Sequence, residues 1–245
     1  MASRNMDLEF QDNEERKYSY DFDTIVRDHL LLRLKPDLNT EGNALELGAY
    51  KGDMTAQLLE YFPVIDVIEA SPILANEVLD RFPGRVSVTT GFIEEVDPKQ
   101  LYDNIFLVHT LEHLDEPESV LNRVANWLKP EGKLFVAVPN ANALSRQIAV
   151  HMGLISHNSA VTKGEIDHGH RRTYSLDTLL SALRKSNLNV TDFGGVVVKP
   201  LANYQFDQAL AQGIVTREFI KACDSLARVL PDLSSSIYAI CKRNQ

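Results

Sequence analysis

The fold of this chain is decided at residues 43–52, which read NALELGAYKG. Ala44 to Leu47 form a short, mostly apolar predicted strand, which leads directly into a turn that begins at Gly48 and ends at Gly52. A helical pattern over residues 55–62 follows and stops at Pro63, because proline cannot continue a helix. A strand, a glycine turn and a helix in this order are the unit from which parallel α/β sheets are built.

The same alternation continues along the rest of the chain. Further strands are predicted at residues 64–69, 85–90, 103–109, 133–138, 189–198 and 236–242, and helical patterns separate most of them. Strands this apolar are typical of a parallel sheet with helices on both faces. We therefore expect an α/β fold with a doubly wound, mostly parallel sheet.

The composition is that of an acidic globular protein. The 245 residues carry a formal charge of −9, which disfavours a nucleic-acid partner because binding to phosphates needs a basic face. Two cysteines, Cys223 and Cys241, are too few for a disulfide scaffold or a zinc-cysteine site. No apolar run approaches the roughly 18 residues of a membrane helix, and the N-terminus is polar and acidic. We expect a cytoplasmic protein that binds small molecules.

The chain divides into a tail and one domain. Residues 1–20 are predicted to be an N-terminal tail, partly disordered, and residues 21–245 a single domain. Beyond Pro139 the strand and helix pattern loosens into a polar segment with four histidines. We expect this segment, about residues 141–175, to be an inserted lid.

Glu69 ends the second predicted strand, 21 residues after Gly48. A carboxylate at this distance can accept hydrogen bonds from both hydroxyls of a ribose. A dinucleotide needs closely spaced glycines around its pyrophosphate, whereas here Tyr50 replaces the middle glycine and Glu46 adds negative charge. The pattern favours a cationic or zwitterionic adenosine ligand over a nicotinamide cofactor. A tight turn followed by a surface glutamate is the alternative.

These motifs resemble those of the class I S-adenosylmethionine (SAM) dependent methyltransferases. The matching segments are NALELGAYKG at 43–52, VIEAS at 67–71, TGFIE at 90–94, HTLEH at 109–113 and LKPEGKL at 128–134. The resemblance covers roughly residues 18–242. It is closest to ubiquinone-biosynthesis O-methyltransferases and to enzymes that methylate sugars or surface glycans. It implies a Rossmann-like sheet of seven strands with the last antiparallel, SAM as cofactor and S-adenosylhomocysteine (SAH) as product.

The resemblance also implies which residues contact the cofactor. Glu46 would lie near the methionine amino group, Gly48 would let the backbone approach SAM, and Glu69 would bind the ribose. Phe92 and Ile93 would pack on the adenine; ordinary core packing of two apolar residues is the alternative. The remaining residues expected on the cofactor are Tyr20, for the methionine carboxylate, Gly52, Ala70 and His109.

A base is needed only if the acceptor has a proton to lose, and histidine titrates in the right range. His113 is the first candidate for this base, and the lid histidines His168 and His170 are the others. An alternative role for His113 is to orient its loop.

The lid is also expected to hold the acceptor, through Arg171, Arg172 and Tyr174, although these residues could equally form a solvated charge cluster. His168 and His170 beside Asp167 could bind zinc, but the sequence offers no third ligand and the resemblance implies no metal. We therefore expect no metal site.

Together these features predict an enzyme that moves the methyl group of SAM to an oxygen, or less readily a nitrogen or carbon, of a small-molecule or sugar-linked acceptor. The alternative is a non-catalytic SAM-binding or scaffold protein with the same fold. We expect no nucleic-acid partner, no membrane span and a possible homodimer. The identity of the acceptor stays open.

Overall fold

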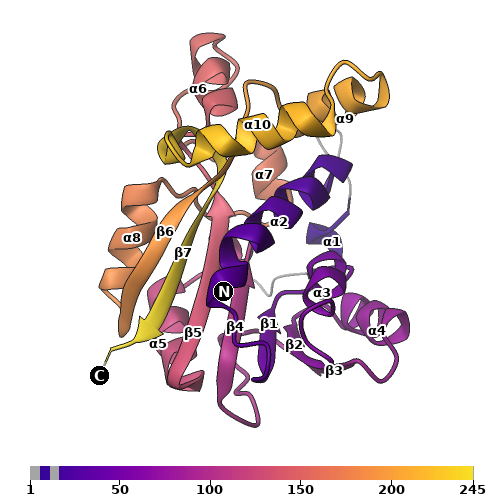
Figure 1. Cartoon of the computed structure of the whole chain (residues 1–245), viewed down its shortest axis with the longest axis vertical. Coiled ribbons are helices and arrows are strands. Elements are labelled where there is room, and N and C mark those ends of the chain that lie inside the picture. Colours follow the sequence, from indigo (N-terminus) through magenta and orange to yellow (C-terminus); the bar gives the residue numbers. More distant parts are fainter. Residues whose placement is uncertain (1–5, 12–16, 245) are drawn as a thin grey trace.

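The computed structural model describes residues 6–11 and 17–244, and these form a sheet of seven strands in the order β3-β2-β1-β4-β5-β7-β6 (Figure 1). Only β7 runs antiparallel to its neighbours. The predicted strands and the antiparallel last strand are confirmed. The strands are β1 (Ala44–Leu47), β2 (Ile65–Glu69), β3 (Val86–Thr90), β4 (Tyr102–Val108), β5 (Leu128–Pro139), β6 (Leu188–Val198) and β7 (Ser234–Arg243).

Helices cover both faces of this sheet. One apolar core lies under α5 (Pro117–Trp127) and α8 (Leu176–Arg184). The other lies under α2 (Asp21–Leu34), α3 (Asp53–Leu58), α4 (Pro72–Arg81), α9 (Asn203–Ala211) and α10 (Arg217–Ala227). Short 3-10 turns are η1 (Lys35–Asp37), η2 (Leu111–His113) and η3 (Pro231–Leu233). The doubly wound architecture is thus confirmed.

The start of β5 differs from the sequence prediction. The sequence predicted a strand that begins at residue 133, but β5 begins at Leu128, which pairs with Tyr102 of β4. The next pair joins Lys133 to Asn104, so the intervening residues of β5 form an irregularity in the ladder. Gly132 is required there, because a Cβ atom would lie 2.5 Å from the Tyr102 carbonyl oxygen.

The predicted lid contains two helices, α6 (Leu144–His151) and α7 (Lys163–Asp167). The two ends of the segment meet, because the Ala141 N–H donates to the Tyr174 carbonyl oxygen at 2.7 Å. Arg146 on α6 connects the parts of the segment: its Nη1 donates to Glu165 Oε1 on α7 at 2.8 Å, and its Nε donates to the Asn158 carbonyl oxygen at 2.7 Å. The insertion is therefore an internally connected unit.

The N-terminal segment also has structure that the sequence did not predict. Met6–Glu9 form the short helix α1, and Ser71 Oγ donates to Asp7 Oδ1 at 2.6 Å at the start of α4. The sequence also predicted a partly disordered tail over residues 1–20. Residues 1–5 and 12–16 of this tail lie outside the described residues.

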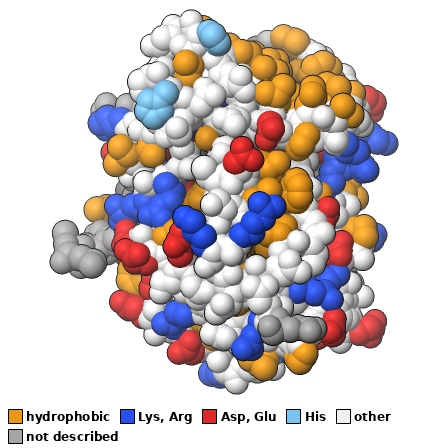
Figure 2. Space-filling model, turned by 90° about the vertical axis from the view of Figure 1, so that its left-hand side faces the viewer, with side chains coloured by type: hydrophobic (Ala, Val, Ile, Leu, Met, Phe, Trp, Pro, Cys, Tyr) orange, Lys and Arg blue, Asp and Glu red, His pale blue; other side chains and the backbone are white. Residues whose placement is uncertain are grey.

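Charged and apolar side chains are distributed differently over the surface. Figure 2 shows acidic and basic side chains interspersed on one face, with hydrophobic side chains gathered toward the end where Figure 1 places α6 and α10. Met152 and Leu154, just after α6, and Phe219 and Leu226 on α10 are among the exposed apolar residues. No helix within residues 6–11 and 17–244 is long and apolar enough to cross a membrane.

Candidate active site

A cavity of about 890 Å³ lies at the carboxyl ends of the parallel strands. Its walls include the glycine turn after β1, the ends of β2 and β4, the first residues of β7 and both lid helices. Helix α1 and the start of α2 complete the enclosure. Open α/β sheets bind their ligands at this edge, so the topology places the predicted motifs around one site.

The glycine turn and Glu69 are joined directly by hydrogen bonds. The Tyr50 N–H donates to Glu69 Oε2 at 3.0 Å, and the Ser71 N–H donates to Glu69 Oε1 at 2.9 Å. Glu69 is buried, and burial raises the pKa of its carboxyl group. The two backbone donors fix the carboxylate at the cavity wall, with lone pairs left on each oxygen for a ligand.

Strained backbone marks three positions at this end of the sheet. Among the described residues, Tyr50 (φ 52°), His109 (φ 52°) and Val197 (φ 53°) are the non-glycine residues with positive φ. Tyr50 thus adopts the left-handed conformation that the missing glycine would take, and its ring stacks on Tyr18 with centroids 4.6 Å apart. Strain of this kind concentrates at functional sites.

Two residues expected on the cofactor do not line the cavity. Gly52 directly precedes α3, and a Cβ atom there would lie 2.7 Å from Phe82 Cε2. The absence of a side chain at Gly52 therefore lets the start of α3 pack against Phe82. Glu46 is buried behind the turn and accepts a hydrogen bond from Thr55 Oγ1 at 2.6 Å. Burial raises the pKa of Glu46 to about 8.

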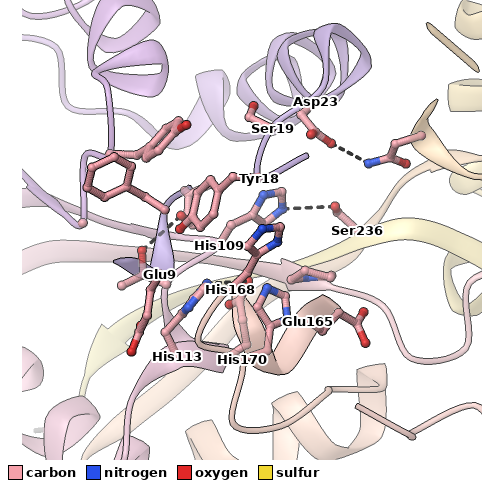
Figure 3. A pocket seen from close by; sticks show the side chains of 18 of the residues that line it. Glu9, Tyr18, Ser19, Asp23, His109, His113, Glu165, His168, His170 and Ser236 are labelled. Atoms are coloured by element: carbon pink, nitrogen blue, oxygen red, sulfur yellow. Dashed lines mark hydrogen bonds and ion pairs between the residues drawn. The ribbon is translucent and has the colours of Figure 1, made fainter. Parts of the chain in front are cut away.

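The other expected cofactor residues line the cavity: Tyr20, Gly48, Glu69, Ala70, Phe92, Ile93 and His109. Gly48 has φ 79°, and a Cβ atom there would lie 2.7 Å from Thr110 Oγ1, so a side chain is excluded. His109 Nε2 lies 3.1 Å from Ser236 Oγ (Figure 3), and burial lowers the pKa of His109 to about 4. His109 is therefore a neutral imidazole at pH 7.

His113 and His170 lie together in the cavity wall (Figure 3), with ring centroids 4.6 Å apart in an edge-to-face arrangement. Glu112 Oε1 lies 4.0 Å from His113 Nε2. Burial raises the pKa of Glu112 to about 8, and its Oε2 has no hydrogen-bond partner among the described residues. The sequence analysis did not predict a functional role for Glu112. The signal that could have indicated one is its position directly before His113.

Glu112, His113 and His170 also offer ligand atoms within 4.8 Å of one another. Two imidazoles and a carboxylate are a donor set that suits zinc and related transition metals. This trio differs from the combination of Asp167, His168 and His170 weighed in the sequence.

His168 has a different environment from the other two histidines. It is buried, and its Nε2 lies 2.9 Å from the Gln11 carbonyl oxygen. A carbonyl oxygen only accepts, so Nε2 carries the proton and donates it. His168 also contacts the Tyr18 ring edge to face at 5.2 Å. These contacts connect the lid to the N-terminal segment.

The three residues expected to hold the acceptor are separated by the structure. Arg172 lines the cavity and donates from Nη2 to the Asp115 carbonyl at 2.9 Å. Arg171 is exposed, does not line the cavity and pairs with Asp115 Oδ1 at 3.2 Å. Tyr174 is buried in the core beneath α8 and does not line the cavity either. Of these three residues, only Arg172 can contact a molecule in the cavity in this conformation.

Arg27 is a cavity residue that the sequence analysis missed. It lies on α2, and its Nε is buried without a hydrogen-bond partner among the described residues. Its guanidinium lies 3.6 Å from Asp53 Oδ2. A helical arginine before the first strand carries no sequence signal, since most arginines are surface residues.

Comparison with known proteins identifies the family. The profile of the methyltransferase domain matches residues 13–192. Ubiquinone biosynthesis O-methyltransferases from Rhodopseudomonas palustris strain BisB5 and Bradyrhizobium sp. strain ORS 278 are each 30% identical, over 45% and 57% of this chain. They are covered over 43% and 55% of their own lengths, so the chain spans about half the length of these curated relatives.

Solved structures agree with the fold. N-methyltransferase NodS from Bradyrhizobium japonicum in complex with SAH has a TM-score of 0.60 at 14% identity and covers 98% of this chain and 97% of its own. A SAM-dependent methyltransferase from Mesorhizobium loti has a TM-score of 0.62 at 13% identity, covering 88% and 98%. The profile match spans most of the chain, and the chain therefore belongs to the methyltransferase domain family, with the Rossmann-like fold of the class I SAM-dependent enzymes.

Proposed function

We propose that this protein transfers the methyl group of SAM to an oxygen atom of a small-molecule or sugar-linked acceptor. The main observation behind this proposal is one cavity that is lined by two chemically different groups of residues. We call the glycine turn with Glu69 the cofactor end, and His113 with His170 the acceptor end. The curated relatives are O-methyltransferases, which favours oxygen as the attacking atom.

The residues of the cofactor end support the proposal of SAM as the ligand. The backbone at Gly48 is free of a side chain, and Glu69 presents oriented oxygens for the ribose hydroxyls. Phe92 and Ile93 supply apolar surface for adenine. Arg27, with its buried unpartnered Nε, and Tyr20 are placed to receive the methionine carboxylate. When bound, SAM supplies an electrophilic methyl group on a positively charged sulfur.

The acceptor end provides a base. His113 would take the proton of an acceptor hydroxyl while the oxygen forms its bond to the methyl carbon and the carbon–sulfur bond breaks. His170 touches the His113 ring and holds its orientation. Glu112 Oε1 lies 4.0 Å from His113 Nε2, so the ionised form of Glu112 would stabilise the protonated imidazole. His109, neutral at pH 7, adds no positive charge to the cavity that would hold the positively charged sulfur of SAM.

The lid would complete the site by excluding water. It contributes His170, Arg172 and Arg146 to the cavity wall, and its ends are joined at Ala141 and Tyr174. A closed lid keeps the acceptor aligned with the methyl group, and alignment supplies much of the rate enhancement in a displacement reaction. Arg172 is the lid cation best placed to contact the acceptor.

Turnover with methyl-labelled SAM against a panel of phenols, catechols and sugars tests the proposal. His113→Ala should lower kcat by about 10²–10⁴ and leave SAH affinity unchanged, because the base contacts only the acceptor. Wild-type activity should rise with pH as the imidazole of His113 loses its proton, and this rise should be absent in His113→Ala. His151→Ala, outside the cavity on α6, is the matched control.

Three other results would change the proposal. Full activity of His113→Ala with a flat pH profile would mean catalysis by alignment alone. If a chelator abolishes activity and zinc restores it, the catalytic group would be a metal held by Glu112, His113 and His170 instead of a histidine base. SAH binding without turnover on any acceptor would favour a non-catalytic binding protein.

A further inference from the structure

Lys199 is a buried cation in the cavity wall that the proposed mechanism does not use. It follows the last residue of β6 and precedes Pro200, and it is only 3% exposed. Lysine is almost never fully buried unless it is paired. The side chain of Lys199 therefore needs an explanation.

Its contacts leave most of its hydrogen-bonding capacity unused. Nζ donates to the Leu201 carbonyl oxygen at 2.7 Å and lies 5.4 Å and 5.6 Å from the ring centroids of Phe22 and Phe206. Within residues 6–11 and 17–244, no carboxylate forms an ion pair with it. An ammonium group has three N–H donors, so two remain for a ligand.

Asp23 is the acidic group that influences Lys199 most. Burial lowers the pKa of Lys199 to about 8, and the negative charge of Asp23 opposes this shift. The Asp23 carboxylate is already engaged, since it accepts from the Tyr20 N–H at 2.8 Å and from Asn203 Nδ2 at 2.6 Å. Lys199 is therefore mostly charged at pH 7 and only partly compensated, which is costly in a buried position.

The backbone just before Lys199 has an unusual conformation. Val197, two residues earlier, has φ 53°, a conformation that a β-branched residue rarely adopts. Val198 pairs with Ser234 of β7, so the strain is contained within the sheet. A strained strand end that delivers a buried cation to a cavity wall is typical of a binding position.

The place of Lys199 in the sheet separates it from the ribose end. It extends β6, whereas Gly48 follows β1 and Glu69 ends β2, and β4, β5 and β7 lie between β6 and these two strands. Ser235 and Ser236 at the start of the neighbouring strand β7 also line the cavity. Lys199 therefore extends a strand that is four positions from β1 in the sheet, while its neighbours Phe22 and Asp23 follow Tyr20 on the chain.

We propose that Lys199 binds an anionic group of the methyl acceptor, a carboxylate or a phosphate. An anion would use the two free N–H donors and compensate the buried charge, while the contacts with Phe22 and Phe206 stay in place. This proposal rests on the proposed function, because it assumes that the cavity holds an acceptor beside the cofactor. It predicts acceptors that are acids.

Calorimetry on SAH-saturated protein tests the proposal with matched pairs of probes. One pair is 4-hydroxybenzoate and 4-hydroxybenzamide, and the other is glucose 1-phosphate and glucose. At least one acid should bind about 10-fold to 100-fold more tightly than its neutral partner, the scale of a hydrogen bond to a charged group. Lys199→Met and Lys199→Gln should abolish this preference. Lys35→Met, which removes an exposed lysine above the Tyr61 ring, should keep it.

The experiment distinguishes a failure of the Lys199 proposal from a failure of the proposed function. SAH binding to wild-type protein is measured first, and its absence contradicts the cofactor assignment rather than the role of Lys199. Equal binding of acid and neutral probes, or no binding by either acid, overturns the Lys199 proposal. A preference that survives in folded Lys199→Met or Lys199→Gln overturns it too. A loss of SAH affinity in these variants would assign Lys199 to the cofactor instead.

Discussion

Removal of the Glu69 carboxylate is the perturbation whose effect follows most directly from the geometry. Backbone N–H groups of Tyr50 and Ser71 hold one carboxylate oxygen each, at 3.0 Å and 2.9 Å. The group is thus oriented before the ligand arrives, and each oxygen keeps a lone pair for a ribose hydroxyl. Hydrogen bonds to a charged group contribute about 1.5–3 kcal/mol. Glu69→Ala should therefore weaken SAH binding by this amount, about 10-fold to 150-fold.

Isothermal titration calorimetry measures this loss, and thermal unfolding shows whether the variant is folded. Glu69→Gln should bind SAH with intermediate affinity, because it keeps one oxygen acceptor. Glu60→Ala, exposed near the end of α3, is the matched control and should bind like the wild type. Wild-type affinity in folded Glu69→Ala would refute the assignment of this carboxylate to the ribose.

Two further predictions concern the lid and the buried Glu46. Residues 141–174 should gain protection from hydrogen exchange when SAH and an acceptor are both bound, because closure excludes water; full protection in the free protein would remove the gating role. Burial raises the pKa of Glu46 from 4.5 to about 8, so the folded protein keeps a proton that the unfolded chain releases. Its contribution to stability is therefore complete below pH 4.5 and declines by at most about 1.4 kcal/mol per pH unit until about pH 8. Urea unfolding at pH 5 and pH 8 should show a smaller decline for Glu46→Gln than for the wild type, and equal declines would contradict the shift.

The sequence predicted the sheet well because the apolar periodicity and the glycine turn are local signals. Each predicted strand lies within a few residues of its observed position, and the cavity forms at the expected edge. The start of β5 was missed because a Pro and a Gly within four residues resemble a turn. Whether such a segment pairs depends on the neighbouring strand, which local sequence does not reveal.

Side-chain direction in irregular segments was the main limit of the sequence analysis. Arg171, Arg172 and Tyr174 lie within four positions, yet one points to solvent, one to the cavity and one to the core. No periodicity applies in such a segment, so their directions come from tertiary packing alone. Lys199 was missed for a similar reason, because a lysine beside a proline resembles an ordinary loop residue.

The central claim is that the cavity is built for SAM, and parallel calorimetric titrations of the wild-type protein with SAH and with NAD test it most directly. The shape of the turn at Gly48 and Tyr50 and the position of Glu69 predict that SAH binds with one-to-one stoichiometry and a Kd in the low-micromolar to millimolar range, on the order of typical enzyme ligands. NAD should give no binding heat. Saturable binding of NAD, or no binding of SAH, would contradict the account.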